Sequence, residues 1–388
     1  MTTDRLTLSA DQSKAHDSII EFWEKGKQLL TLGGYAGTGK TTLLGETVRT
    51  LRKRKKGCSI ADARIAFCCY TGKASDVLRS KLKDSGVYSE SDYCGTIHGL
   101  MYRPLFGSNG KIIGWKPHDT LPYDLIVVDE ASMVGERLYD DLKQYKIPIL
   151  AVGDHGQLPP IKGNFNLMED PMIRLEKIHR QAEDNPVIKL SMMARLEGYI
   201  PVGVYSYDKQ YVKKVRDINI LQHEANPENM LVLCGVNWFR TKKNQEIRKR
   251  AGMVFETPQP GDRVICLRNN KEAGIYNGML GTLEEMKEDT ETTYGAIIQM
   301  DNGVLYDGRI YQEQFSRAKT MDVRLNKDNP IDLFDFGYCL TVHKAQGSEH
   351  PRVVVFEQRT QYMDDDMWRR WSYTAVTRSS KNLIVVGI

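Results

Sequence analysis

Gly34-Tyr35-Ala36-Gly37-Thr38-Gly39-Lys40-Thr41-Thr42 is the stretch that decides the fold. It matches the pattern G-x-x-x-x-G-K-[ST] at each fixed position. The apolar residues 28–32 before it are typical of a buried strand, and residues 43–51 after it are typical of a helix. A glycine loop between a strand and a helix is the context that this pattern requires. We therefore predict a phosphate-binding loop in a parallel α/β sheet.

The chemistry of this loop indicates which groups would bind a nucleoside triphosphate. Glycines let successive backbone N–H groups face a phosphate, and the positive end of the following helix adds to the attraction. Lys40 is placed to reach the β- and γ-phosphates of ATP, and the Thr41 hydroxyl is placed to bind Mg²⁺. The predicted nucleotide-binding residues of the loop are Gly34, Gly37, Thr38, Gly39, Lys40, Thr41 and Thr42.

The composition of the 388-residue chain is that of a globular protein with two or three domains. Hydrophobic residues make up 41% of the chain, but no apolar run is long enough to span a bilayer, so we expect no membrane partner. The seven cysteines form no C-x-x-C pair. This spacing argues against a zinc site or a disulfide framework and favours a cytoplasmic location, in the host cytoplasm if the chain is phage-encoded.

Basic residues gather in two places, although the net charge is only +4. One run covers residues 49–56 and the other covers residues 240–250. Either run could bind the phosphates of a nucleic acid, or could be the solvated face of a helix. We favour the solvated face for the first run and leave both interpretations open for the second.

Two more strands end in polar groups that suit catalysis. The apolar strand at 125–128 is followed by Asp129 and Glu130, and the strand at 149–152 is followed by Gln157. Open α/β sheets bind their ligands at the carboxyl ends of the strands. We therefore expect Asp129 to bind Mg²⁺ and Glu130 to orient or deprotonate the attacking water. Gln157 is placed to sense the γ-phosphate.

A helix is predicted over residues 6–26, with Ser9 as its N-cap. Gln12 lies in this helix, a short way before the glycine loop in the sequence. Its side-chain amide carries one donor and one acceptor, and so could read an adenine base. The alternative is that Gln12 is an ordinary surface glutamine.

Residues 101–115 alternate apolar and polar side chains around Ser108-Asn109-Gly110, a pattern that predicts a β-hairpin. Pro104 in the first arm favours an edge strand, because proline cannot donate to a sheet. A hairpin that leaves a parallel sheet is either functional or a surface elaboration, and the pattern alone does not decide between them.

The second half of the chain starts another α/β pattern with an apolar strand at 231–234 and a basic helix at 238–250. Glycines and short alternating apolar runs then fill residues 255–325, which predicts a small antiparallel barrel inserted into this second domain. The α/β pattern resumes in apolar runs at 338–341, 353–356 and 383–386.

Five further segments resemble, in the correct order, motifs of superfamily 1 helicases of the RecD-like and Dda-like branch. They are residues 70–74, 96–98, 153–160, 341–348 and 373–378. With Gln12 and the glycine loop, the resemblance covers nearly the whole chain. It implies a fold of class α/β with two RecA-like parallel-sheet domains in tandem, at residues 1–187 and 188–388. It also implies a pin hairpin at about 101–118 and an SH3-like barrel inserted at about 255–330.

The resemblance assigns roles that the residues alone would not support. Arg378 is expected to be an arginine finger that approaches ATP from the second domain, Arg180 a second finger, and Gly347 a nucleotide contact. On the DNA side, Phe106 or Trp115 of the pin would stack on a base at the fork. Contacts to DNA phosphates and sugars are expected from Thr71, Lys73, Thr96, His98, Thr341 and His343.

These features predict a DNA helicase that depends on ATP and Mg²⁺, moves 5′ to 3′ along single strands, and opens duplex DNA with its pin. The polarity comes from the resemblance only. We expect single-stranded and fork DNA as partners, replication or recombination proteins as further partners, and a functional monomer. Two alternatives keep the ATPase: a translocase that displaces proteins, or an RNA-directed superfamily 1 enzyme. A nucleotide-switched binding module is disfavoured, because Glu130, Gln157 and Arg378 form a complete hydrolytic set.

Overall fold

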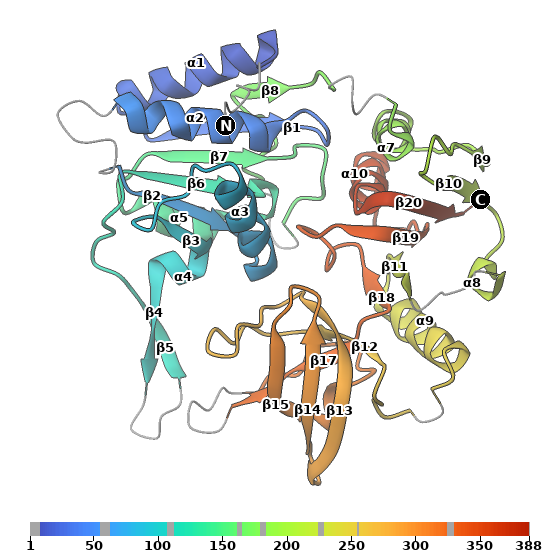
Figure 1. Ribbon diagram of the computed structural model, residues 1–388. Coiled ribbons are helices and arrows are strands. Elements are labelled where there is room, and N and C mark those ends of the chain that lie inside the picture. Colours follow the sequence, from blue (N-terminus) through green and yellow to red (C-terminus); the bar gives the residue numbers. More distant parts are fainter. Residues whose placement is uncertain are drawn as a thin grey trace. The chain divides into compact units, whose positions relative to one another are not determined.

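The computed structural model describes residues 8–54, 63–106, 112–160, 165–178, 184–223, 229–253, 256–323 and 330–387. The chain forms two compact units (Figure 1). The first holds most residues up to Glu183, and the second holds residues from Asp184 onward together with Thr71–Lys73 and Pro104–Lys116. No helix in these described ranges combines the length and the apolar character that a membrane crossing requires.

The first unit is built on a parallel sheet of six strands in the order β3-β2-β6-β7-β1-β8. The strands are β1 (Leu29–Gly34), β2 (Ile65–Cys69), β3 (Tyr93–Thr96), β6 (Leu125–Asp129), β7 (Ile149–Gly153) and β8 (Ile173–Leu175). The helices are α1 (Ala10–Glu24), α2 (Lys40–Arg54), α3 (Gly72–Asp84), α4 (Ile97–Met101) and α5 (Glu136–Lys143), with a 3₁₀ turn η1 (Ala131–Met133). The predicted parallel α/β arrangement is confirmed, and Ser9 caps α1 as expected.

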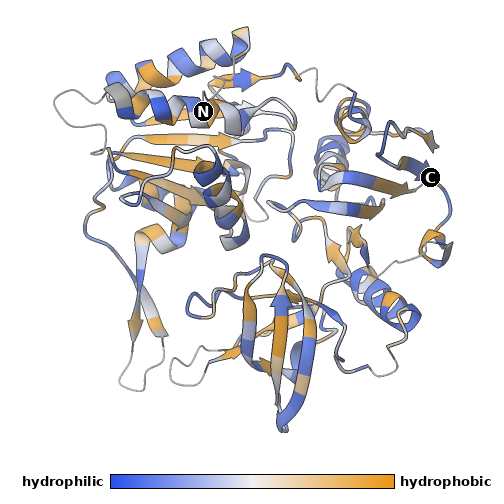
Figure 2. Cartoon of the chain, in the orientation of Figure 1, coloured by the Kyte–Doolittle hydropathy of each residue, from blue (hydrophilic) through white to orange (hydrophobic). Residues whose placement is uncertain are grey.

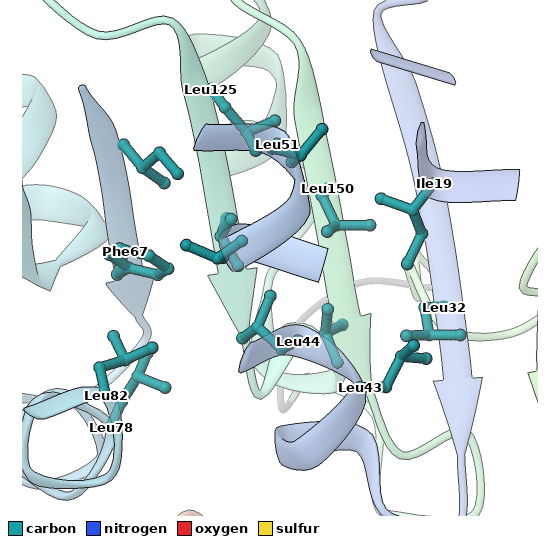
Figure 3. Close-up of a cluster of buried hydrophobic side chains, with 14 of the residues drawn as sticks. Ile19, Leu32, Leu43, Leu44, Leu51, Phe67, Leu78, Leu82, Leu125 and Leu150 are labelled. Carbon is teal, nitrogen blue, oxygen red and sulfur yellow. The ribbon is translucent and has the colours of Figure 1, made fainter. Parts of the chain in front are cut away.

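Leucines from the helices cover one face of this sheet (Figure 3). The leucines at this interface are at most 2% exposed. They are Leu43, Leu44 and Leu51 from α2, and Leu32, Leu125 and Leu150 from the strands. A second cluster covers the other face, so that the five residues of β7 are all buried. The strands β6 and β7 are accordingly built mostly of hydrophobic residues (Figure 2). Each fully buried leucine contributes about 1.5–3 kcal/mol, which holds the strand ends in place.

The predicted hairpin forms the strands β4 (Tyr102–Phe106) and β5 (Ile112–Pro117), which pair as a two-stranded sheet. Both strands of such a sheet are edges, which explains why Pro104 is tolerated. The side chains of Ile113 and Trp115 are 71% and 60% exposed. The turn residues 107–111 lie outside the described residues.

The second unit contains a second six-stranded sheet, in the order β18-β11-β19-β20-β10-β9, with only β9 antiparallel to its neighbour. Its strands are β9 (Gly203–Val204), β10 (Val212–Val215), β11 (Leu231–Cys234), β18 (Cys339–Thr341), β19 (His350–Phe356) and β20 (Ser379–Val386). Its helices are α7 (Pro186–Glu197), α8 (Ile220–His223), α9 (Asn237–Arg250) and α10 (Asp365–Val376). The second α/β pattern of the sequence is therefore confirmed.

The insert between α9 and β18 is a third sheet, in the order β16-β15-β14-β13-β12-β17. Its strands are β12 (Arg263–Cys266), β13 (Leu280–Thr290), β14 (Thr293–Met300), β15 (Leu305–Tyr311), β16 (Ile331–Asp332) and β17 (Phe334–Phe336). One residue separates β16 from β17, although these strands lie at opposite ends of the strand order. The chain thus joins the two edges of the sheet, which gives it the form of a small barrel.

The end of the insert differs from expectation. The sheet continues to Phe336, beyond the expected end near residue 330, because β16 and β17 are very short and carry the buried carboxylates of Asp332 and Asp335. Short strands with buried charges have no recognisable alternation. Within the insert, the strand β13 runs to Thr290, and its polar second half pairs with β14 across a two-residue turn.

The basic residues of α9 attach the insert to the second sheet. Arg248 is 1% exposed, and its Nε and Nη2 lie 2.8 and 2.9 Å from the two carboxylate oxygens of Asp262. Its guanidinium also lies 3.9 Å from the centroid of the Phe336 ring. Arg240 binds Asp335 at 2.8 Å, again in the interior. The basic run 240–250 was predicted either to bind nucleic acid or to be a solvated helix face. Neither holds for Arg240 and Arg248, because each is buried and paired with an aspartate.

Candidate nucleotide-binding and DNA-binding site

The glycine loop connects the end of β1 to the start of α2 and is held by its own backbone and side chains. Gly37 and Gly39 have φ angles of 81° and 76°, in the left-handed region that favours glycine. The Thr38 hydroxyl donates a hydrogen bond to the Tyr35 carbonyl at 2.8 Å. The two left-handed glycines and this hydrogen bond curl the backbone of the loop. Phosphate binding by its N–H groups stays a prediction.

The lysine of the loop is held by loop carbonyl groups. Lys40 Nζ lies 2.6 Å from the Gly34 oxygen and 3.0 Å from the Tyr35 oxygen. Thr41 and Thr42 are exposed in the first turn of α2. A bound phosphate would compete with the two carbonyl oxygens for the same ammonium group.

Three neighbouring strands bring the other candidate groups to this edge of the sheet. The strand β7 lies between β1 and β6, and Gly33 pairs with Gly153 across β1 and β7. All three strands run in the same direction, so their carboxyl ends meet at one edge. The structure thus places Lys40, Asp129, Glu130 and Gln157 at or just after the ends of three adjacent strands.

The acidic pair after β6 has two unusual properties. Burial raises the pKa of Asp129, while the positive charge of Lys40 acts in the opposite direction. Glu130 has φ 52° and ψ 41°, a left-handed conformation that costs a non-glycine residue about 1 kcal/mol or more. The Glu130 N–H donates to the Asp129 carboxylate at 3.0 Å. Strain and a perturbed carboxylate in one place are typical of an active site.

The turn after β7 fixes the backbone at Gln157. Asp154 is 2% exposed and accepts a hydrogen bond from the Gly156 N–H at 2.9 Å. Its carbonyl accepts from the Gln157 N–H at 3.2 Å. The ring of His155 lies 4.1 Å from that of Tyr35 and so links this turn to the glycine loop. Sequence patterns do not predict this ring contact, because His155 and Tyr35 follow two strands that become neighbours only in the folded sheet.

Gln12 contacts the glycine loop directly. Its Nε2 lies 3.1 Å from the Thr38 oxygen, and its Oε1 accepts from the Ser9 N–H at 3.0 Å. The residue is 3% exposed, so the interpretation as a surface glutamine is wrong. The side chain joins the start of α1 to the loop, and reading of adenine by this amide stays a prediction.

The candidate DNA contacts near β2 and β3 include an aromatic row. Thr96 caps α4 by accepting from the Gly99 N–H at 3.0 Å. The ring of His98 lies 6.5 Å from that of Tyr70 and 5.9 Å from that of Tyr102. Tyr70 is 41% exposed and was not predicted as a contact, although it begins the segment 70–74.

Four further predicted residues lie at the ends of elements or outside the described residues. Thr71 immediately precedes α3, and Lys73 lies in its first turn. Phe106 ends β4, but its side chain lies outside the described residues, as does the whole of Arg180. The DNA contacts of Thr71, Lys73 and Phe106 and the finger role of Arg180 stay predictions.

In the second unit, Thr341 ends β18 and Gly347 adopts a φ of 71° in the segment that follows. Burial lowers the pKa of His343, which keeps its imidazole neutral near pH 7 and able to act as a hydrogen-bonding group. A neutral imidazole suits contact with a sugar or phosphate without adding charge.

Arg378 joins two of the predicted motif segments. It is 4% exposed, and its guanidinium donates to the Thr374 carbonyl at 3.0 Å, the Ser348 carbonyl at 3.2 Å and the Thr377 hydroxyl at 3.1 Å. Thr374 and Thr377 lie at the carboxyl end of α10, where a cation is favourable. The segments 341–348 and 373–378 therefore meet through this side chain.

Two family models match the chain. Residues 7–212 match the AAA domain, and residues 336–386 match the UvrD-like helicase C-terminal domain. The first match alone covers more than half of the chain.

Curated relatives match nearly the full chain at low identity. The ATP-dependent RecD2 DNA helicase of Deinococcus radiodurans is 26% identical over 99% of this chain and 49% of the relative. The ATP-dependent DNA helicase Pif1 of Campylobacter jejuni is 23% identical over 86% of this chain and 85% of the relative. The chain thus spans about half the length of RecD2 and most of that Pif1.

Solved structures of Pif1 helicases share the fold. One comes from a study of DNA unwinding at forked duplexes by two coordinating Pif1 helicases. It matches with a TM-score of 0.59 and 17% identity, and the match covers 98% of this chain and 92% of that chain. A Bacteroides Pif1 in complex with ADP-AlF3 and single-stranded DNA has a TM-score of 0.57 and 16% identity, over 98% of this chain and 93% of its own.

Proposed function

Because the chain belongs to the 5′–3′ branch of the superfamily 1 helicases, we propose that it is a DNA helicase driven by ATP hydrolysis. It would move 5′ to 3′ along single-stranded DNA and unwind duplex DNA. The observation that supports this proposal is the position of Lys40, Asp129, Glu130 and Gln157 at or just after the ends of three adjacent strands. A phosphate-binding lysine, two carboxylates and a polar sensor together form a hydrolytic site.

The residues at this edge fit a nucleotide with Mg²⁺. The donor set of the Thr41 hydroxyl and the Asp129 carboxylate consists of oxygen atoms, which Mg²⁺ prefers. Burial disfavours the charge of Asp129, and a bound cation would compensate for that cost. Mg²⁺ would supply charge stabilisation at the phosphates. The nucleotide itself would be held by Gln12, Gly34, Gly37, Thr38, Gly39, Lys40, Thr41, Thr42 and Gly347.

Hydrolysis would use the protein groups in distinct roles. Glu130 would take a proton from the attacking water. Its left-handed backbone sets the direction in which the side chain leaves the chain. Gln157 would report the loss of the γ-phosphate. Arg378 would leave the end of α10 and approach the phosphates, with Arg180 as a second cationic contact.

The domains would divide this work. We assign residues 1–187 and 188–388 to two RecA-like domains, with an SH3-like fold for the inserted barrel and a role for it in holding the strand. The DNA backbone would contact Thr71, Lys73, Thr96, His98, Thr341 and His343. We also infer a functional monomer in the cytoplasm, acting on single-stranded and fork DNA with replication or recombination proteins.

The exposed hairpin would serve as the strand-separating pin, with Phe106 or Trp115 against a base at the fork. Base stacking on an aromatic ring is worth about 1–3 kcal/mol. We expect Trp115→Ala to slow unwinding of a forked duplex about 5- to 150-fold while ATPase activity on single strands is unchanged. The matched control is Ile113→Ala, which removes an exposed apolar side chain from the same strand without removing a ring. Equal effects of the two variants would rule out stacking by Trp115.

ATP turnover with different nucleic acids tests the proposed function. We expect single-stranded DNA to stimulate hydrolysis, and single-stranded RNA of the same sequence to stimulate it far less. Stimulation by RNA alone would identify an RNA-directed enzyme, and no turnover with either would identify a binding module.

A further inference from the structure

Trp238 is a large apolar residue in an unusual position. It lies in the first turn of α9, and 64% of its surface is exposed. Its indole packs against the Phe239 ring in a T-shaped arrangement, with ring centroids 5.6 Å apart and planes at 78°. Phe239 is buried and lies 5.2 Å from the ring of Phe356. The core thus supports the indole on one side and leaves most of it open to solvent.

A single exposed apolar residue needs no special explanation, so the position of Trp238 decides its meaning. Cys234 at the end of β11 pairs with Thr341 at the end of β18, and the Val342 N–H donates to the Cys234 carbonyl at 3.0 Å. On the other side, the Gly235 N–H donates to the Gln358 side chain at 2.8 Å. The turn that leads to Trp238 therefore lies at the carboxyl edge of the sheet, beside the segment that carries Thr341.

A lysine accompanies the indole on the same face of the helix. Lys242 follows Trp238 by four residues, a spacing that places two side chains next to each other. Its side chain is 65% exposed, and its Nζ lies 4.0 Å from the Glu246 carboxylate, at the outer limit of an ion pair. By contrast, Arg240 and Arg248 of this helix are buried in ion pairs.

We propose that Trp238 stacks on an unpaired base of single-stranded DNA and that Lys242 binds a neighbouring phosphate. Single-strand binders combine these two contacts, and stacking tolerates any base because every base has a flat face. This inference rests on the proposed function, since it adds a holding contact beside Thr341 in the second unit. Neither side chain takes part in a chemical step.

The two contacts have different signatures in a binding experiment with labelled oligothymidylate. Trp238→Ala should weaken binding about 5- to 150-fold and leave the salt dependence unchanged, because stacking involves no counterion. Lys242→Ala should reduce the slope of log K against log salt by about 0.7, the value for one phosphate contact on a single strand. Trp238→Phe should restore most of the affinity, since phenylalanine also offers a ring.

Fluorescence gives a second readout. Oligothymidylate should quench the tryptophan emission of the wild-type protein, and the quenching should be smaller in Trp238→Phe. The matched controls are Tyr207→Ala and Lys209→Ala, which change exposed residues in the turn between β9 and β10, at the opposite end of the strand order. Neither control should change affinity, quenching or salt dependence.

The outcomes separate this inference from the proposed function. If the wild-type protein binds no single-stranded DNA, the proposed function fails together with the contact. If the wild type binds but Trp238→Ala keeps full affinity and Trp238→Phe keeps full quenching, only the contact is overturned. An equal loss in Tyr207→Ala would also overturn it, because the effect would then not depend on position.

Discussion

Arg378→Ala should lower the rate of DNA-stimulated ATP hydrolysis by about 10³- to 10⁵-fold, the range in which an arginine finger acts. The guanidinium lies in one of the two segments that meet at the end of α10. Removal of the side chain takes away the cation that would stabilise charge on the transferred phosphoryl group. Binding of nucleotide and of single-stranded DNA should be retained, so the loss should be in kcat.

Arg378 also has a structural role that must be separated from catalysis. It satisfies the carbonyls of Thr374 and Ser348, and loss of a buried hydrogen bond costs about 1–3 kcal/mol. Thr377→Val serves as the matched control, because it removes a hydroxyl that contacts Arg378 and keeps the charge. Its ATPase rate should stay within about tenfold of wild type. A comparable loss in both variants, or a rate for Arg378→Ala near that of wild type, would contradict the finger assignment.

Arg248→Met should destabilise the joint between α9 and the inserted barrel by about 3–5 kcal/mol, because it leaves the Asp262 carboxylate buried without its partner. Asp262 is fully buried and also accepts a hydrogen bond from the Tyr338 hydroxyl at 3.0 Å. The free energy of local opening of α9 and β12, measured by hydrogen exchange, reports this effect without requiring two-state unfolding.

Two further variants test the cause of this destabilisation. Arg248→Met with Asp262→Asn should recover most of the loss, because the uncompensated charge is gone while an oxygen remains for Tyr338. Lys249→Met changes the adjacent, exposed residue and should shift the opening free energy by less than about 0.5 kcal/mol. If Lys249→Met were as destabilising as Arg248→Met, burial of the ion pair would not be the reason.

The parts of the fold that could be predicted from the sequence are those with local signals. The glycine loop and the apolar strands β1, β6 and β7 have patterns that span fewer than ten residues. Because parallel strands share one carboxyl edge, these patterns also predicted that Asp129 and Gln157 would lie near the loop. The hairpin was predicted for the same reason, from alternation around a turn.

The parts that could not be predicted depend on partners far away in the chain. The basic run of α9 has the composition of a nucleic-acid contact, but Arg240 pairs with Asp335, which lies 95 residues later. Burial of Gln12 against Thr38 is a similar case, because Thr38 comes 26 residues later in the chain. Short strands such as β16 escape detection because two residues show no periodicity.

Unwinding of two tailed duplexes tests the central claim most directly. One substrate carries a 5′ single-stranded tail and the other a 3′ tail, with the same duplex and the same excess of protein. With ATP and Mg²⁺ present, the proposed function predicts strand separation of the 5′-tailed substrate only. Separation of the 3′-tailed substrate alone, or of neither while single-stranded DNA still stimulates ATP hydrolysis, would contradict it.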